Sequence, residues 1–244
     1  MMKKAFVAST ALVLCASASF AGEQSRRPAS ANAQFLAWYG GAEHQPKPHD
    51  TSKLLYEQSA SSGFSTYGIS SWGVSGSAPC HSCFDPMAAD DFTVPGTGKY
   101  KVTAVYVPGR ILSGTEPTSF YITFYQELKY SKINLRTTVA IKATCTTTSY
   151  SDLGHGDFLV DLSSCNLGRF KNGHDYSLSV QPWFWSNGSW AWQTNSKQIG
   201  RQGFVDLFGG GGGSCNEQLT PIKICFPESG YGPDLAFAIY GRQL

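Results

Sequence analysis

The sequence WFWSNGSWAW, residues 183–192, places two short aromatic runs on either side of Asn187-Gly188. Asparagine and glycine both accept the positive φ angles of a two-residue type I′ turn, so this pair is a strong signal for a β-hairpin. Side chains alternate between the two faces of a strand. The stretch therefore predicts a hairpin that carries four indoles on one face, those of Trp183, Trp185, Trp190 and Trp192.

The strand before this hairpin decides which way the indoles point. Tyr176, Leu178 and Val180 alternate with polar residues and should face the core. Carried forward without a break, that alternation places the four indoles outside. Pro182 cannot donate to a strand ladder and is typical of a bulge, which would turn the indoles inward. Two alternatives stay open: indoles buried as core, or an exposed aromatic patch of the kind that marks binding sites.

From about Leu54 onward, aromatic and β-branched residues alternate with polar ones between clusters of turn residues. The strands predicted from this pattern are 54–58, 64–72, 90–94, 100–107, 120–126, 138–144, 158–162, 176–180, the hairpin 183–192, 203–207 and 235–240. No helical pattern reaches three turns. Many short strands without helices predict an all-β fold, an antiparallel β-sandwich formed by one domain over residues 51–244.

Residues 88–95, AADDFTVP, resemble a motif of uncharacterised exported bacterial β-sandwich proteins, which carry A-D-D-F-T-V-P near their first core strand. In those proteins a G-x-x-Y strand and a terminal F-x-I-x-G strand follow, and residues 173–176 and 237–241 fit these places. The resemblance implies a jelly-roll-like sandwich and no activity. Residues 183–192 also resemble the tryptophan zipper of small designed hairpins, a resemblance that concerns conformation only.

The N-terminus has the pattern of a secretory signal over residues 1–21, with Lys3 and Lys4 before a short apolar run and Ser19-Phe20-Ala21 as a cleavage site. Residues 22–50 are predicted to be a flexible leader. The expected location is therefore secreted or periplasmic, without a membrane anchor. Removal of the signal leaves 17 basic residues against 17 acidic ones, and a neutral domain without a basic face predicts no nucleic-acid partner.

Six cysteines remain after the signal, and an even number in an exported chain predicts disulfides. Close spacing favours three local pairs: Cys80–Cys83, Cys145–Cys165 and Cys215–Cys225. Cys80 and Cys83 also have the spacing of redox and zinc motifs. Neither a βαβ context nor a second C-x-x-C accompanies them, so a structural disulfide is favoured.

Asp90 and Asp91 are candidate ligands for a structural calcium ion, because sandwich domains hold calcium with acidic side chains and carbonyls at strand ends. The alternative is that one faces water and the other caps a turn. No organic cofactor is predicted.

Hydrolytic motifs are not found, neither G-x-S-x-G nor H-E-x-x-H. Asp91, Glu127 and Asp157 could form an acid/base pair only if they lay about 5–10 Å apart across a cleft. A non-catalytic role is favoured. It is either a module that binds polysaccharide or a cell surface through its indoles, since aromatic faces suit sugars, or a structural surface protein without a ligand. A glycan-active hydrolase is the third alternative.

Overall fold

The computed structural model describes residues 52–58, 68–70, 73–74, 86–132, 136–154, 156–185, 188–195, 197–206, 218–227 and 233–244. The predicted signal and leader lie outside these ranges, as do Cys80, Cys83 and Cys215. The described parts are almost entirely strands, with one helical turn, α2 (Ile222–Cys225). None of their helices is long and apolar enough to cross a membrane.

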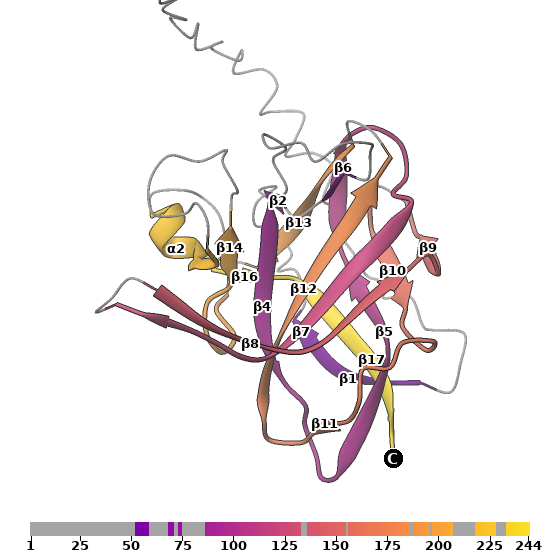
Figure 1. Ribbon diagram of the computed structural model, residues 1–244, viewed down its shortest axis with the longest axis vertical. Helices are drawn as coiled ribbons and strands as arrows, with labels where there is room; N and C mark the ends of the chain where they lie inside the picture. The colour runs from indigo at the N-terminus through magenta and orange to yellow at the C-terminus, as the bar shows by residue number, and fades with distance from the viewer. Residues whose placement is uncertain are drawn as a thin grey trace, which may run out of the picture.

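The strands of the described residues form two large sheets and one smaller sheet (Figure 1). The first sheet has the order β1 (Lys53–Gln58), β17 (Phe237–Gln243), β5 (Lys99–Val107), β10 (Phe158–Asp161) and β9 (Tyr150–Asp152), with β11 (Phe170–Lys171) also paired to β5. The second has the order β15 (Thr220–Pro221), β14 (Phe204–Asp206), β4 (Met87–Thr93), β12 (Asp175–Phe184), β7 (Ser119–Ser131) and β8 (Arg136–Thr147), with β3 (Gly73–Val74) on β12. The smaller sheet joins β16 (Asp234–Leu235), β13 (Ser189–Asn195) and β2 (Gly68–Ser70), with β6 (Gly109–Ser113) on β13.

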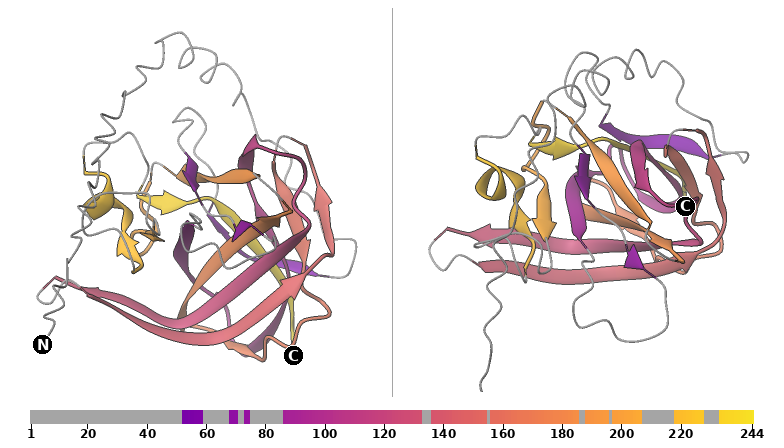
Figure 2. Two further views of the ribbon diagram at one scale, coloured as in Figure 1. Left: turned by 45° about the horizontal axis from the view of Figure 1, so that its top comes forward. Right: turned by 90° about the horizontal axis from the view of Figure 1, so that it is seen from above.

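The two large sheets curve around a shared interior (Figure 2). Their inner faces meet in an aromatic cluster centred on Phe92 of β4. Its ring lies 6.1 Å from that of Phe124 in the same sheet and 6.4 Å from that of Phe237 in the opposite sheet. Edge-to-face contacts of this kind stabilise beyond the area that they bury. Strand pairs in the described residues are antiparallel except β3 with β12, so the predicted all-β antiparallel sandwich is confirmed.

The C-terminal strand is central, as its alternation predicts. The predicted strand 235–240 is divided at Ala236: Leu235 lies in β16 of the smaller sheet, whereas Phe237 and Ile239 lie in β17. All three are buried in the main core, and β17 is paired on one side with β1 and on the other with β5. The motif at residues 88–95 forms β4 and the turn after it. There Ala88, Phe92 and Val94 face the same core.

The predicted tryptophan hairpin is wrong. β12 ends before Asn187-Gly188 in the sequence and β13 begins after it, but the two strands lie in different sheets. At its end nearest the turn signal, β12 pairs with β7 through Trp183 and with β3 through Trp183 and Phe184, so it offers β13 no free edge. β13 instead pairs with β6, β2 and β16. Tertiary pairing has overridden a local turn signal, and the zipper resemblance does not extend to the structure.

One disulfide lies wholly within the described residues, Cys145–Cys165, with Cα atoms 5.9 Å apart. It connects β8, at an edge of the second sheet, to the turn that follows β10 in the first, and it confirms one of the three predicted pairs. Cys225 is disulfide-bonded as well. The predicted pairs that involve Cys80, Cys83 and Cys215 include residues outside the described ranges.

Removing this cross-link should destabilise the protein, because the bond closes a loop with a sequence separation of 20 residues. We expect the variant Cys145→Ser with Cys165→Ser to lose about 2–4 kcal/mol of unfolding free energy. Urea unfolding at fixed pH measures it. An unchanged denaturation midpoint would show that packing between the sheets holds this region without the bond.

Candidate functional site

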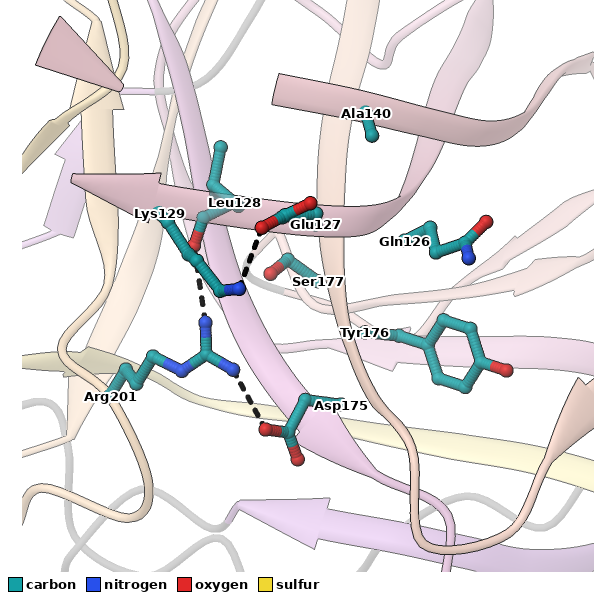
Figure 3. A pocket seen from close by; sticks show the side chains of 9 residues that line it. All are labelled: Gln126, Glu127, Leu128, Lys129, Ala140, Asp175, Tyr176, Ser177 and Arg201. Carbon is teal, nitrogen blue, oxygen red and sulfur yellow. Dashed lines mark hydrogen bonds and ion pairs between the residues drawn. The ribbon is translucent and has the colours of Figure 1, made fainter. Parts of the chain in front are cut away.

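A polar groove opens where β7 runs beyond the end of β12 (Figure 3). The last β12–β7 pair is Ser177–Tyr125, whereas the β7–β8 pairing continues to Ser131–Arg136. β7 and β12 therefore separate like a fork. The space between them has a volume of about 420 Å³ and is lined by Gln126, Glu127, Leu128, Lys129, Ala140, Asp175, Tyr176, Ser177 and Arg201.

An irregularity in the β7–β8 ladder shapes this groove. The register passes from Tyr125–Ile141 directly to Glu127–Ala140, which leaves Gln126 without a partner in the ladder. Bulges bend a strand, increase its twist and redirect its side chains, and they are frequent beside binding sites. Gln126 is exposed at the wall of the groove.

Arg201 spans the fork. Its Nη2 lies 2.7 Å from Oδ2 of Asp175 at the start of β12, and its Nη1 donates to the carbonyl oxygen of Leu128 on β7 at 3.4 Å. The β7 backbone beyond Tyr125 has no partner on β12, so this donor satisfies a carbonyl at the open edge. The side chains of Arg201 and Asp175 are 42% and 52% exposed, which leaves both accessible to a ligand.

A second ion pair lies on the β7 wall, where Nζ of Lys129 is 2.7 Å from Oε1 of Glu127. The hydrogen bond and charge of Lys129 lower the pKa of Glu127. Hydrogen bonds from Thr93 and Arg201 lower the pKa of Asp175. The groove thus holds two carboxylates in their charged form and two cations, together with the amide of Gln126 and the hydroxyl-bearing side chains of Tyr176 and Ser177.

Behind this groove lie three aspartates. Asp90 of β4 is fully buried and accepts three hydrogen bonds: from Nε2 of Gln58 at 2.8 Å, the backbone N–H of Leu235 at 2.6 Å and that of Asp91 at 2.8 Å. Asp91 accepts the backbone N–H of Arg201 at 2.9 Å. Asp234 is fully buried in β16 and accepts the backbone N–H of Ile199 through Oδ2, whereas its Oδ1 has no hydrogen-bond partner.

The four predicted indole ligands do not share a face. Trp190 and Trp192 are fully buried in the core and donate their Nε1–H to the carbonyl oxygens of Gly156 and Ala236, both at 2.7 Å. Trp183 is half-buried, and Trp185 is 74% exposed. The predicted binding face of four tryptophans is therefore wrong for Trp190 and Trp192, and the buried alternative holds for these two.

The calcium prediction for Asp90 and Asp91 also meets a geometric obstacle. Consecutive residues of a strand point to opposite faces. Asp90 faces the core beside Gln58, and Asp91 faces the segment that carries Arg201. One ion would not be held by both side chains. In the described ranges, no three His, Cys, Asp or Glu side chains gather as metal ligands.

The acid/base candidates Asp91, Glu127 and Asp157 have separate roles. Asp157 accepts the backbone N–H of Gly109 at 2.9 Å and the hydroxyl of Tyr106 at 3.2 Å, which fixes the loop before β10. Asp91 accepts the backbone N–H of Arg201. Of these three candidates, only Glu127 lines the groove. The sequence patterns missed Arg201, Lys129, Asp175 and Asp234. Of these four residues, Asp175 alone lies inside a motif that the sequence analysis recognised, the G-x-x-Y motif.

Comparisons with protein-family models, with curated proteins and with solved structures found no match to this chain.

Proposed function

We propose that this protein is an exported, non-catalytic binding protein whose groove between β7 and β12 holds a neutral, hydroxyl-rich ligand, a stretch of glycan. The observation that carries this proposal is the balance of charges in the groove. The two carboxylates of Glu127 and Asp175 are matched by the two cations of Lys129 and Arg201, and the amide of Gln126 lies beside them. Hydroxyl groups donate to carboxylates and accept from cations, so a sugar can use both kinds of partner at once. A strongly charged ligand would meet no excess of opposite charge.

The carboxylates of the groove support binding rather than hydrolysis. A glycosidase needs one carboxyl group that keeps its proton near neutral pH, which requires a raised pKa. The pKa of Glu127 is lowered by Lys129, and that of Asp175 is lowered by Thr93 and Arg201. Both carboxylates are therefore suited to accept hydrogen bonds from ligand hydroxyls.

The proposal predicts that Gln126→Ala with Lys129→Ala weakens glycan binding and leaves the fold intact. Both side chains are exposed, and the Lys129–Glu127 pair is a surface pair that contributes little stability. The loss of two hydrogen-bonding side chains should raise the dissociation constant about tenfold. Affinity electrophoresis against a panel of polysaccharides, followed by calorimetry with the best ligand, measures it.

Trp185→Ala is the matched control, because it removes an exposed side chain that does not line the groove. This variant should bind like the wild type. Loss of binding in Trp185→Ala, with normal binding in the groove variant, would place the ligand on the exposed indole instead. A wild-type protein that no polysaccharide retains would contradict the proposal.

A further inference from the structure

The backbone of Arg201 is held by Asp91 of β4, a residue that does not itself line the groove. Arg201 belongs to the segment 197–203, which is neither helix nor strand. Its backbone N–H donates to Oδ1 of Asp91 at 2.9 Å, and Asp91 is only 8% exposed. Because water has little access to this carboxylate, the hydrogen bond is not easily replaced by one to solvent.

The contact between Asp91 and the segment is close enough to require glycine at the position before Arg201. Gly200 has a φ of +88°, and a Cβ atom built there would lie 2.6 Å from Oδ2 of Asp91. A side chain at this position would be strained by the backbone angle and would push the segment away from the carboxylate. Asp91 therefore fixes the segment with one oxygen by a hydrogen bond and with the other by direct packing.

The guanidinium end of Arg201 is held from the same strand. Thr93 lies two residues beyond Asp91 and therefore on the same face of β4. Its Oγ1 donates to Oδ1 of Asp175 at 2.8 Å, and Oδ2 of Asp175 lies 2.7 Å from Nη2 of Arg201 (Figure 3). Both oxygens of Asp175 are thus oriented, one by the threonine and one by the arginine.

These contacts close a ring in which β4 sets both ends of Arg201. The β4–β12 ladder pairs Asp91 with Ser177 and Thr93 with Asp175. The distance between the hold on the backbone and the hold on the guanidinium is therefore fixed by the sheet.

The flanks of the segment have anchors of their own. Ile199 donates its backbone N–H to Asp234, and Gly203 donates its own to the carbonyl oxygen of Pro233 at 2.7 Å. Loss of the central hold should therefore displace Arg201 without detaching the whole segment.

We propose that Asp91 is a positioning residue of the groove, which places the guanidinium of Arg201 by holding the backbone beneath it. An arginine side chain that is held in place beforehand loses less conformational freedom when a ligand binds, so a ligand gains more from its hydrogen bonds. This role differs from the calcium-ligand and acid/base roles that the sequence suggested for Asp91. The effect on glycan binding rests on the proposed function, whereas the placement of the guanidinium does not.

A pair of variants at Asp91 tests the placement. Asp91→Asn keeps an oxygen that can accept the N–H of Arg201, whereas Asp91→Ala removes the acceptor. NMR relaxation of the Arg201 Nε–H in the full chain reports the order of this side chain. We expect its order parameter to fall below about 0.6, the range of flexible groups, in Asp91→Ala and to stay near the wild-type value in Asp91→Asn.

Two further variants complete the test. Gly200→Ala leaves Asp91 intact but forces the segment away from it, so Arg201 should lose order as in Asp91→Ala. Asp152→Ala is the matched control, because it also removes a carboxylate that accepts a backbone N–H, that of Gly154 at 2.8 Å, and it does not line the groove. This control should leave the order of Arg201 unchanged.

Glycan binding by the same variants shows whether the placement matters for the ligand. Asp91→Ala should raise the dissociation constant about tenfold, and Asp91→Asn should stay within about twofold of the wild type. In a background of Arg201→Ala, the change Asp91→Ala should have little further effect, because a residue that acts through Arg201 loses its influence with it.

An Arg201 side chain as ordered in Asp91→Ala as in the wild type, or as disordered in Asp91→Asn as in Asp91→Ala, would overturn the positioning role. Additive losses of binding in the double variant would overturn it too. If Asp91→Ala does not fold, Gly200→Ala decides, and an Arg201 as ordered there as in the wild type contradicts the role.

The two proposals fail separately. A loss of order in Asp91→Ala, together with a wild-type protein that no polysaccharide retains, refutes only the proposed ligand. Glycan retention, together with an Arg201 that stays ordered in Asp91→Ala, refutes only the positioning role.

Discussion

Trp190→Ala should lower the unfolding free energy by about 3–5 kcal/mol, whereas Trp185→Ala should change it by less than about 0.5 kcal/mol. The two indoles lie five positions apart and are equally large, but Trp190 is fully buried and Trp185 is 74% exposed. The indole of Trp190 packs 6.0 Å from that of Trp192 and 6.3 Å from the ring of Phe158. Its removal leaves a large cavity between the smaller sheet and the first sheet.

The neighbours of Trp190 cannot close that cavity easily. Its Nε1–H donates to the carbonyl oxygen of Gly156, which would lose its partner. Gly109 lies against the indole so closely that a Cβ atom would be 2.2 Å from the ring, and this backbone is fixed by Asp157. Urea unfolding followed by far-ultraviolet circular dichroism measures both variants. Equal losses in the two variants would contradict the burial on which the contrast depends.

The alternation of apolar and polar residues predicted best those strands whose apolar face is buried in the core. Phe237 and Ile239 of β17 face the core that Leu235 of β16 also enters, and so the last strand is recognisable from sequence. The hairpin failed for the opposite reason. Its signal was local, from Asn187-Gly188, whereas the end of β12 beside it pairs with β3 and β7, which come much earlier in the chain.

The groove could not be predicted, because it depends on the relative lengths of strands that are far apart in sequence. The β7 strand was expected to end at Gln126 and instead continues to Ser131, and the extra residues form the wall of the groove. Arg201 reaches Asp175 across 26 positions, from a segment without any recognisable motif. The aspartates show the same limit, since Asp90 drew attention through its motif but Asp234 did not.

The same chemical change at two of these aspartates should have opposite effects. Asp90 uses both carboxylate oxygens as acceptors for three N–H donors, so Asp90→Asn places an NH₂ group against at least one of them. Gln58 cannot compensate by rotating its amide, because its Oε1 already accepts the hydroxyl of Tyr56 at 2.8 Å. Unsatisfied buried donors each cost about 1–3 kcal/mol, so we expect a loss of about 2–5 kcal/mol wherever Asp90 is ionised.

Asp234→Asn keeps the oxygen that accepts from Ile199 and replaces the oxygen without a partner by an NH₂ group. This variant should match the wild type at pH 5.5, where Asp234 is neutral, and exceed its unfolding free energy at pH 8, where the wild-type carboxyl is charged beside Asp90. Urea unfolding of both variants at these two pH values gives four differences from the wild type. Destabilisation of Asp234→Asn at pH 8 would mean that the charge of Asp234 stabilises the fold. Contacts of the ionised carboxylate would then outweigh the burial and the neighbouring charge that raise its pKa.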